Sequence, residues 1–251
     1  MRKPLLLSMA FVLTASVAFP VIAHADTTYD SNGTIGFVPG TGVTPPVNPE
    51  NPDPNSPVSP INPDGTTPQP GTPGPLSIDF ASSFDFGTHP ISNKDQTYNA
   101  KAQSYSGTTV ETPNYVQVTD NRGTNAGWIL KVEENGQFTE TTKGVNPELK
   151  GAMISLKNPL PNSNGDATAP NAQAAFNITP GQETVIATAA EGTGAGTWTI
   201  HWGTTSDLTQ GSDNEGTVSP DVQLFVPGST VKDAATYTTT LNWILAQLPT
   251  N

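Results

Sequence analysis

Short runs in which apolar and polar residues alternate dominate the chain from Leu76 onward. Residues 116–119 read Val-Gln-Val-Thr, and residues 198–202 place Trp198, Ile200 and Trp202 at every second position. A period of two brings alternate side chains to the same face of a strand, so each run predicts a strand with one face in the core. Residues 222–226 and 241–245 predict two further strands.

Turn sequences separate these runs, and Thr, a β-branched residue that favours strands, is abundant between them. The turns contain Asn-Gly, Pro-Gly or similar groups at residues 121–123, 134–136, 162–165 and 227–228. A short helix is conceivable only at residues 167–175. The pattern therefore predicts an all-β fold, most simply an antiparallel β-sandwich-like domain over residues 75–251.

The residues before this domain have a different composition. Residues 26–40 form a short polar leader with four sizeable apolar side chains, Tyr29, Ile35, Phe37 and Val38. Residues 41–74 consist mainly of Pro, Asn, Asp, Gly, Ser and Thr. Proline at this density blocks helices and removes ladder donors, which predicts an extended, disordered Pro-rich linker with a reach of roughly 100 Å. The linker could serve as a spacer or as a Pro-rich ligand for a partner domain.

The first 25 residues have the features of a secretory signal peptide. Arg2 and Lys3 precede an apolar run at residues 5–22, and Ala23-His24-Ala25 supplies a small-residue cleavage site. A membrane anchor is the alternative, but polar residues and Pro20 interrupt the run. No later segment is apolar enough to span a membrane, so the sequence predicts a secreted mature chain that begins at Asp26.

Charge and cysteine content exclude several classes of function. The net charge of the whole chain is −12, and loss of Arg2 and Lys3 with the signal peptide would change it to −14. An acidic surface repels phosphate backbones, which argues against nucleic acid as a partner. The chain has no cysteine, so it has no disulfide, thiol nucleophile or thiolate metal site.

Residues suited to catalysis or metal binding are few. The mature histidines are His89, which precedes a proline, and His201, in the middle of a predicted strand. The carboxylate pairs Asp79/Asp85 and Glu133/Glu134 are too ordinary to indicate a glycosidase, and no Gly-x-Ser-x-Gly motif is present. The sequence predicts no enzymatic activity and no cofactor.

One loop has part of the oxygen spacing of a calcium site. Asn162, Asn164 and Asp166 occupy alternate positions, as the first ligands of a calcium loop do. The glycine is misplaced, and the twelfth position holds Gln173 instead of the required Glu. The spacing favours a solvated loop, so we expect no metal site.

The triplet Trp-x-Leu occurs twice, as Trp128-Ile129-Leu130 and as Trp243-Ile244-Leu245. The first follows the segment 116–124 (Val-Gln-Val-Thr-Asp-Asn-Arg-Gly-Thr), and the second follows Tyr237 and Leu241. Together with the export signal, these motifs resemble the WxL domain of Gram-positive bacterial surface proteins. The resemblance extends from about Leu76 to the end of the chain.

The resemblance implies a surface protein that attaches non-covalently to the cell wall, with peptidoglycan as the expected ligand and co-encoded surface proteins as further partners. Alternatively, the chain is a structural subunit that membrane-anchored or sortase-linked partners retain indirectly. The motif residues either form part of the core or stack on wall sugars. Trp202, at the end of its predicted strand and followed by Gly203, is a candidate for wall contact.

Overall fold

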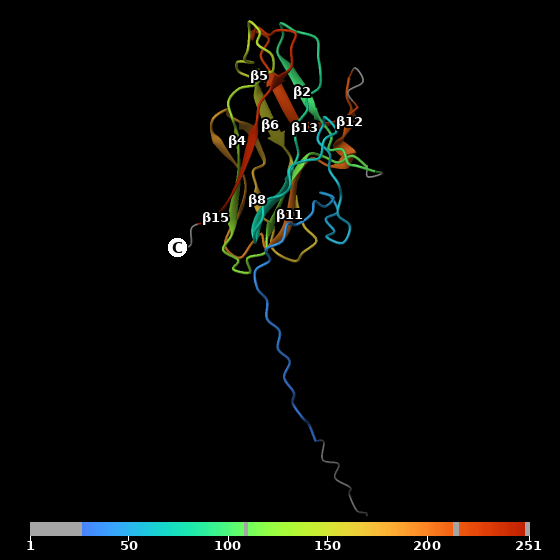
Figure 1. Ribbon diagram of the computed structural model, residues 1–251, viewed down its shortest axis with the longest axis vertical. Helices are drawn as coiled ribbons and strands as arrows, with labels where there is room; N and C mark the ends of the chain where they lie inside the picture. The colour runs from blue at the N-terminus through green and yellow to red at the C-terminus, as the bar shows by residue number, and fades with distance from the viewer. Residues whose placement is uncertain (1–26, 108–109, 213–215, 249–251) are drawn as a thin grey trace, which may run out of the picture. The chain divides into compact units, whose positions relative to one another are not determined.

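Almost all regular structure in the described residues is β-strand (Figure 1). The computed structural model describes residues 27–107, 110–212 and 216–248, and the predicted signal peptide lies outside them. The chain divides into two units, Met1–Phe37 and Val38–Asn251. All strands belong to the second unit. Their bounds are β1 (Leu76–Ala81), β2 (Gln96–Lys101), β3 (Tyr115–Asp120), β4 (Trp128–Glu134), β5 (Thr139–Glu140), β6 (Met153–Lys157), β7 (Pro159–Asn162), β8 (Asn171–Ala172), β9 (Ala175–Ile178), β10 (Glu183–Ala189), β11 (Gly196–Trp202), β12 (Thr209–Gln210), β13 (Thr217–Val226), β14 (Tyr237–Thr238) and β15 (Leu241–Gln247).

The strands pair antiparallel in three main sheets and one small one. The first sheet has the order β1-β3-β11-β7, and the second has the order β15-β4-β10-β8. The third has the order β12-β13-β6-β9, with β2 also paired to β13, while β14 and β5 form the small sheet. The all-β prediction is confirmed. The short helix considered for residues 167–175 is not found, because residues 171–172 form β8 and pair with β10.

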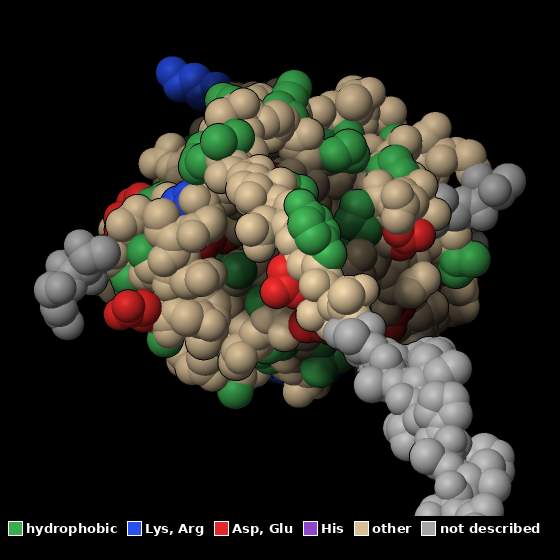
Figure 2. All heavy atoms as spheres, turned by 90° about the horizontal axis from the view of Figure 1, so that it is seen from below, with side chains coloured by type: hydrophobic (Ala, Val, Ile, Leu, Met, Phe, Trp, Pro, Cys, Tyr) green, Lys and Arg blue, Asp and Glu red, His purple; other side chains and the backbone are tan. Residues whose placement is uncertain are grey.

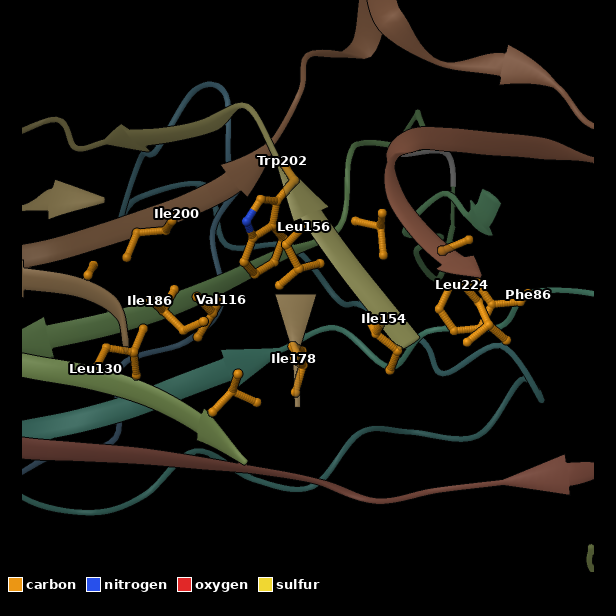
Figure 3. Close-up of a cluster of buried hydrophobic side chains, with 14 of the residues drawn as sticks. Phe86, Val116, Leu130, Ile154, Leu156, Ile178, Ile186, Ile200, Trp202 and Leu224 are labelled. Atoms are coloured by element: carbon orange, nitrogen blue, oxygen red, sulfur yellow. The ribbon is translucent and has the colours of Figure 1, made fainter. Parts of the chain in front are cut away.

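One hydrophobic core collects the inward faces of these sheets (Figure 3). In β4 every second side chain is buried, so Trp128, Leu130, Val132 and Glu134 point inward. Strand β4 thus has the alternation expected of a strand with one face in the core. Each fully buried aliphatic side chain contributes about 1.5–3 kcal/mol relative to an exposed one, which makes this face the main stabilising surface of the domain.

Strand β3 is buried on both faces, whereas its alternating sequence predicted one buried and one exposed face. Its outward-facing Gln117 is covered by residues that precede the β-domain. The Gln117 Oε1 atom accepts a hydrogen bond from the Val47 N–H at 2.8 Å, and its Nε2 donates to the Pro45 carbonyl at 3.1 Å. From β11, the Thr199 hydroxyl donates to the Pro49 carbonyl at 2.8 Å. Residues 45–62 thus lie against the outer face of the first sheet, and we call them the strap.

The second half of the strap follows the chain near Ser104. The Ile61 N–H donates to the Ser104 carbonyl at 3.0 Å, and Gln103 Nε2 donates to the Ile61 carbonyl at 2.9 Å. The predicted free linker is therefore wrong for the strap, although the segment contains no regular helix, as its proline content requires. Proline removes an N–H donor but keeps its carbonyl, and side chains of the sheet donate to these carbonyls.

Beneath the strap, the carboxylate of Asp79 is buried in a network of hydroxyl and amide donors. It accepts hydrogen bonds from Ser77 Oγ at 2.7 Å, Thr119 Oγ1 at 2.6 Å and Gln117 Nε2 at 2.9 Å. Burial raises the pKa of Asp79, and these three hydrogen bonds oppose that rise. Gln117 thus connects the strap to a buried carboxylate, which accounts for a glutamine with no exposed surface.

We expect Gln117→Ala to destabilise the domain by about 2–3 kcal/mol, because it leaves the Val47 N–H without a partner and removes one of the three hydrogen bonds to the buried Asp79 carboxylate. The strap should also exchange its amide hydrogens faster. Urea denaturation and hydrogen–deuterium exchange over residues 45–50 measure the two effects. Gln182→Ala, at an exposed position, is the matched control. Equal stability of the two variants would contradict the role given to Gln117.

Candidate functional site

The two Trp-x-Leu motifs lie on neighbouring strands, β4 and β15 (Figure 1). The strands run antiparallel, with Leu245 opposite Leu130 and Trp243 opposite Val132. Directly opposite residues of an antiparallel pair share a face, so both tryptophans and both leucines point toward the core. The middle residues, Ile129 and Ile244, lie on the other face and are half-buried. The repeat thus marks one continuous structural surface assembled from distant parts of the chain.

Trp128 is a core residue with no exposed side-chain surface. Its indole Nε1 donates to the Gly194 carbonyl at 2.9 Å, which satisfies its single donor. Gly194 has a φ of +70°, and a Cβ there would lie 2.4 Å from the Ala189 Cβ and 2.8 Å from Trp128 Nε1. Of the two roles predicted for Trp128, the structure therefore supports the core role, and a glycine is needed where the loop passes over the ring.

Trp202 also lies in the core, which differs from the wall contact predicted for it. It has no exposed surface because it alternates with Trp198 and Ile200 on the inward face of β11. Its ring centroid lies 6.1 Å from that of Trp243 and 6.2 Å from that of Phe84. A ring in this position cannot touch a wall polymer while the domain is folded. The turn at Gly203 follows Trp202 in the chain, so it does not change the face of β11 on which the Trp202 ring lies.

Trp243 is half-buried and borders a hollow that we call the aromatic groove, lined among others by Phe84, Phe86, Phe138, Leu241 and Trp243. Its volume is about 1350 Å³. Ring centroids of Phe84 and Phe86 lie 6.4 Å apart, and those of Phe86 and Phe138 lie 6.3 Å apart, both in edge-to-face arrangement. The groove is a mainly apolar cavity at one side of the core, suited to apolar side chains or flat rings.

A second hollow, of about 970 Å³, has a polar lining and adjoins the first at His89 and Tyr98. We call it the polar groove, and its lining includes Lys94, Gln96, Asn99 and Gln210. The His89 and Tyr98 rings stack with centroids 3.9 Å apart and planes 18° apart. His89 Nε2 lies 2.6 Å from the Phe86 carbonyl oxygen, which can only accept, so Nε2 is the donor.

Electrostatics in the polar groove differ from those of the chain as a whole. Lys94 lines the groove, and Lys232 Nζ donates to the nearby Ser92 carbonyl at 3.0 Å. Burial raises the pKa of Tyr98, so its phenol stays neutral at physiological pH. The groove therefore combines a ring face, amide side chains and an ammonium group, which suits a ligand with hydroxyl, amide and carboxylate groups.

Residues weighed as catalytic or metal-binding have other partners. Asn162 Nδ2 donates to the Pro49 and Glu50 carbonyls of the strap, and its Oδ1, the atom that would bind calcium, accepts a hydrogen bond from the Ser163 N–H at 3.0 Å. His201 is buried, its Nδ1 lies 2.8 Å from the Gly203 carbonyl oxygen, and burial lowers its pKa. Asp85 forms an ion pair with Lys101 at 2.7 Å. Over the part of the chain that the structure describes, no three His, Asp or Glu residues gather as a metal site would require.

Glu134 is an ionisable residue on the core face of β4. The sequence did not indicate this burial, because Glu133 and Glu134 form an ordinary carboxylate pair. It ends β4 opposite Leu241, and its side chain has no exposed surface. Neither carboxylate oxygen has a hydrogen-bond partner among the described residues. Burial raises the pKa of Glu134 from its usual 4.5 to about 7. The folded domain therefore favours the protonated acid.

We expect the domain to lose stability as the pH rises from 4.5 to 7. An acid whose pKa is higher in the folded state binds more protons there, so its full contribution is present below the unfolded pKa of 4.5 and is lost by about pH 7. The difference is about 3 kcal/mol. Urea denaturation at pH 4.5 and pH 8 measures it, and Glu134→Gln should remove this pH dependence. Parallel pH profiles for the variant and the original chain would contradict the assignment.

The polar groove was not predicted from the sequence. The sequence indicates only a catalytic or metal-binding role for His89, and it gives no signal for Tyr98 or Gln96 because β2 carries no clear alternation. Their juxtaposition with Gln210 depends on the pairing of β13 with both β2 and β12. The Trp-x-Leu repeat is the sequence feature that comes nearest to this region, and its residues form the part of the core beside the aromatic groove.

Comparison with protein families supplies the remaining observation. A family model described as WxL domain surface cell wall-binding matches residues 24–249, nearly the whole chain. No curated protein and no solved structure matches the chain. In the described residues, no helix is long and apolar enough to cross a membrane.

Proposed function

The chain belongs to the WxL family of surface cell-wall-binding domains, and from this premise we propose that it binds peptidoglycan through the polar groove without catalysing a reaction. The match over residues 24–249 carries the general function. We further propose that residues 1–25 are removed on export and that the β-domain, residues 75–251, is the part that binds the wall.

The chemistry of the polar groove supports peptidoglycan as the ligand. Peptidoglycan presents sugar hydroxyls, N-acetyl groups and peptide carboxylates. The ring face of Tyr98 suits the apolar face of a sugar, and Gln96 and Asn99 can both donate to and accept from hydroxyl and acetamido groups. Lys94 provides an ammonium group for a peptide carboxylate. The motif residues Trp128 and Leu130 are buried in the core and line neither groove, so we assign them no contact with the ligand.

Charge argues against binding that depends on general attraction. The face shown in Figure 2 has acidic side chains at several separate places and little basic surface. An acidic chain is repelled by anionic wall polymers, so retention requires local contacts. We therefore propose a local site around Lys94, and we expect binding to survive moderate salt.

Tyr98→Ala should weaken binding to purified peptidoglycan at least tenfold, because it removes the ring face and the stack with His89. Loss of one aromatic contact of this kind is worth about 1–3 kcal/mol. Tyr98→Phe keeps the ring and should bind within about threefold of the original chain. Val185→Ala, which shortens an exposed side chain on β10, is the matched control. Unchanged binding of Tyr98→Ala would place the wall site elsewhere.

Indirect retention through other surface proteins is the second candidate. The observation that favours it is the apolar character of the aromatic groove, which could take protein side chains as readily as sugars. In that case the domain would bind partner proteins and would not sediment with protein-free peptidoglycan.

A further inference from the structure

The leader carries large apolar side chains that are mostly exposed to solvent. Tyr29 is 95% exposed, Ile35 78%, Phe37 89% and Val38 88%. In the described part of the leader, residues 27–40, there is no helix or strand. Exposed apolar residues concentrated in a short segment indicate a segment that becomes ordered on binding. Ile35 and Phe37 are two positions apart, so in an extended conformation they would point to the same side.

Strand β15 offers an unpaired edge to such a segment. It stands at the end of the second sheet and, among the described residues, pairs with β4 alone. The outer side of β1, the edge of the neighbouring sheet, is different because the Thr72 N–H and hydroxyl both bond to the Ile78 carbonyl. An unpaired strand edge is a template for an added strand from another chain.

The aromatic groove lies beside the first half of this edge. Leu241 and Trp243, at alternate positions of β15, line the groove together with Phe84 and Phe86 from the segment after β1. A strand added to β15 would direct every second side chain toward the groove. The volume of about 1350 Å³ accommodates an isoleucine and a phenylalanine side chain.

The leader of the same chain is too short to place Phe37 there. The Gly40 N–H donates to the Asn121 carbonyl at 3.2 Å, and the adjacent Arg122 donates to Gln247 at 2.8 Å, so the last residue of the leader lies near the end of β15. Phe37 is three residues from Gly40 and can reach about 10 Å. Trp243 lies about 13 Å and Leu241 about 20 Å along β15 from Gln247.

We propose that the leader of one copy of this chain adds to the free edge of β15 in a second copy, with Ile35 and Phe37 in its aromatic groove. The leader leaves the domain near the end of β15, whereas the groove lies beside the beginning of that strand. The contact is therefore heterologous, and repetition produces a head-to-tail chain of copies. Backbone hydrogen bonds to β15 would supply affinity, and the two inserted side chains would supply specificity.

Sedimentation equilibrium of the mature chain over a range of concentrations tests the proposal. We expect oligomers of increasing size, and we expect Ile35→Asp/Phe37→Asp to remain monomeric over at least a tenfold wider concentration range. These positions lie in an exposed segment outside the β-domain, so the variant retains its fold. Ser31→Asp, in the same segment, is the matched control for added charge.

A peptide of residues 27–40 tests the groove directly. Titrated into the Ile35→Asp/Phe37→Asp chain, it should bind saturably and change the intrinsic tryptophan fluorescence, a change that should be lost when Trp243→Phe is added, while the same peptide with Phe37→Asp should bind at least tenfold more weakly. The proposal would be overturned if oligomers persisted in the double variant. It would also be overturned if the monomeric double variant did not bind the peptide. So would a concentration-independent monomer whose leader amides are protected from exchange, since that outcome places the leader on its own chain.

Discussion

Trp128→Ala should lower the free energy of unfolding by about 3–5 kcal/mol, the largest effect expected of any single substitution in the Trp-x-Leu motifs. The substitution empties a site with no exposed surface and removes the hydrogen bond to the Gly194 carbonyl. A loss of this size is a large share of the stability of a typical domain. Urea denaturation followed by circular dichroism measures it.

Trp128→Phe separates the two contributions at this position. It retains most of the packing but leaves the Gly194 carbonyl without its partner, so we expect an intermediate loss. Ile129→Ala, on the half-buried opposite face of β4, should have a smaller effect. A stable Trp128→Ala domain with impaired wall binding would mean that the ring serves the ligand, in contradiction to its burial.

Trp202→Ala should be nearly as damaging, also by about 3–5 kcal/mol, because Trp202 is fully buried against Trp243 and Phe84. The indole Nε1 of Trp202 has no hydrogen-bond partner among the described residues. Trp202→Phe therefore removes an unsatisfied donor as well as some volume. We expect it to be about 1–2 kcal/mol less destabilising than Trp128→Phe, which breaks a satisfied hydrogen bond.

A Trp202→Leu variant distinguishes a core role from wall contact, because it removes the aromatic face but keeps a large apolar side chain in the core. If Trp202 only supports the core, the folded variant should bind peptidoglycan as the original chain does. Binding is measured at a urea-free condition where circular dichroism shows the variant to be folded. A folded Trp202→Leu domain with tenfold weaker binding would restore the contact role that the sequence suggested.

Sequence patterns predicted the all-β fold because alternation is a local property of each strand. The period-two pattern predicted for residues 241–245 agrees with β15, in which Leu241, Trp243 and Leu245 share one face. The pairing of the two motifs on neighbouring strands was beyond the pattern. It depends on which strands meet across more than a hundred residues, and local periodicity carries no information about that.

The strap shows a second limit of composition. Residues 41–74 have the composition of a disordered linker, yet Val47 is 1% exposed and bonds to Gln117. Composition reports what a segment lacks, here ladder donors and helix formers. It does not report that a neighbouring sheet presents amide and hydroxyl groups to the carbonyls of the segment. The prediction of wall contact for Trp202 was wrong for a related reason, because a side chain at the end of a strand can still face the core.

The most direct test of peptidoglycan binding is co-sedimentation of the mature chain with purified sacculi stripped of proteins and accessory polymers. We predict saturable binding that persists in moderate salt and requires no other protein. Absence of the chain from the pellet at every concentration, with binding restored by extracts of surface proteins, would contradict direct attachment and show that partner proteins retain it.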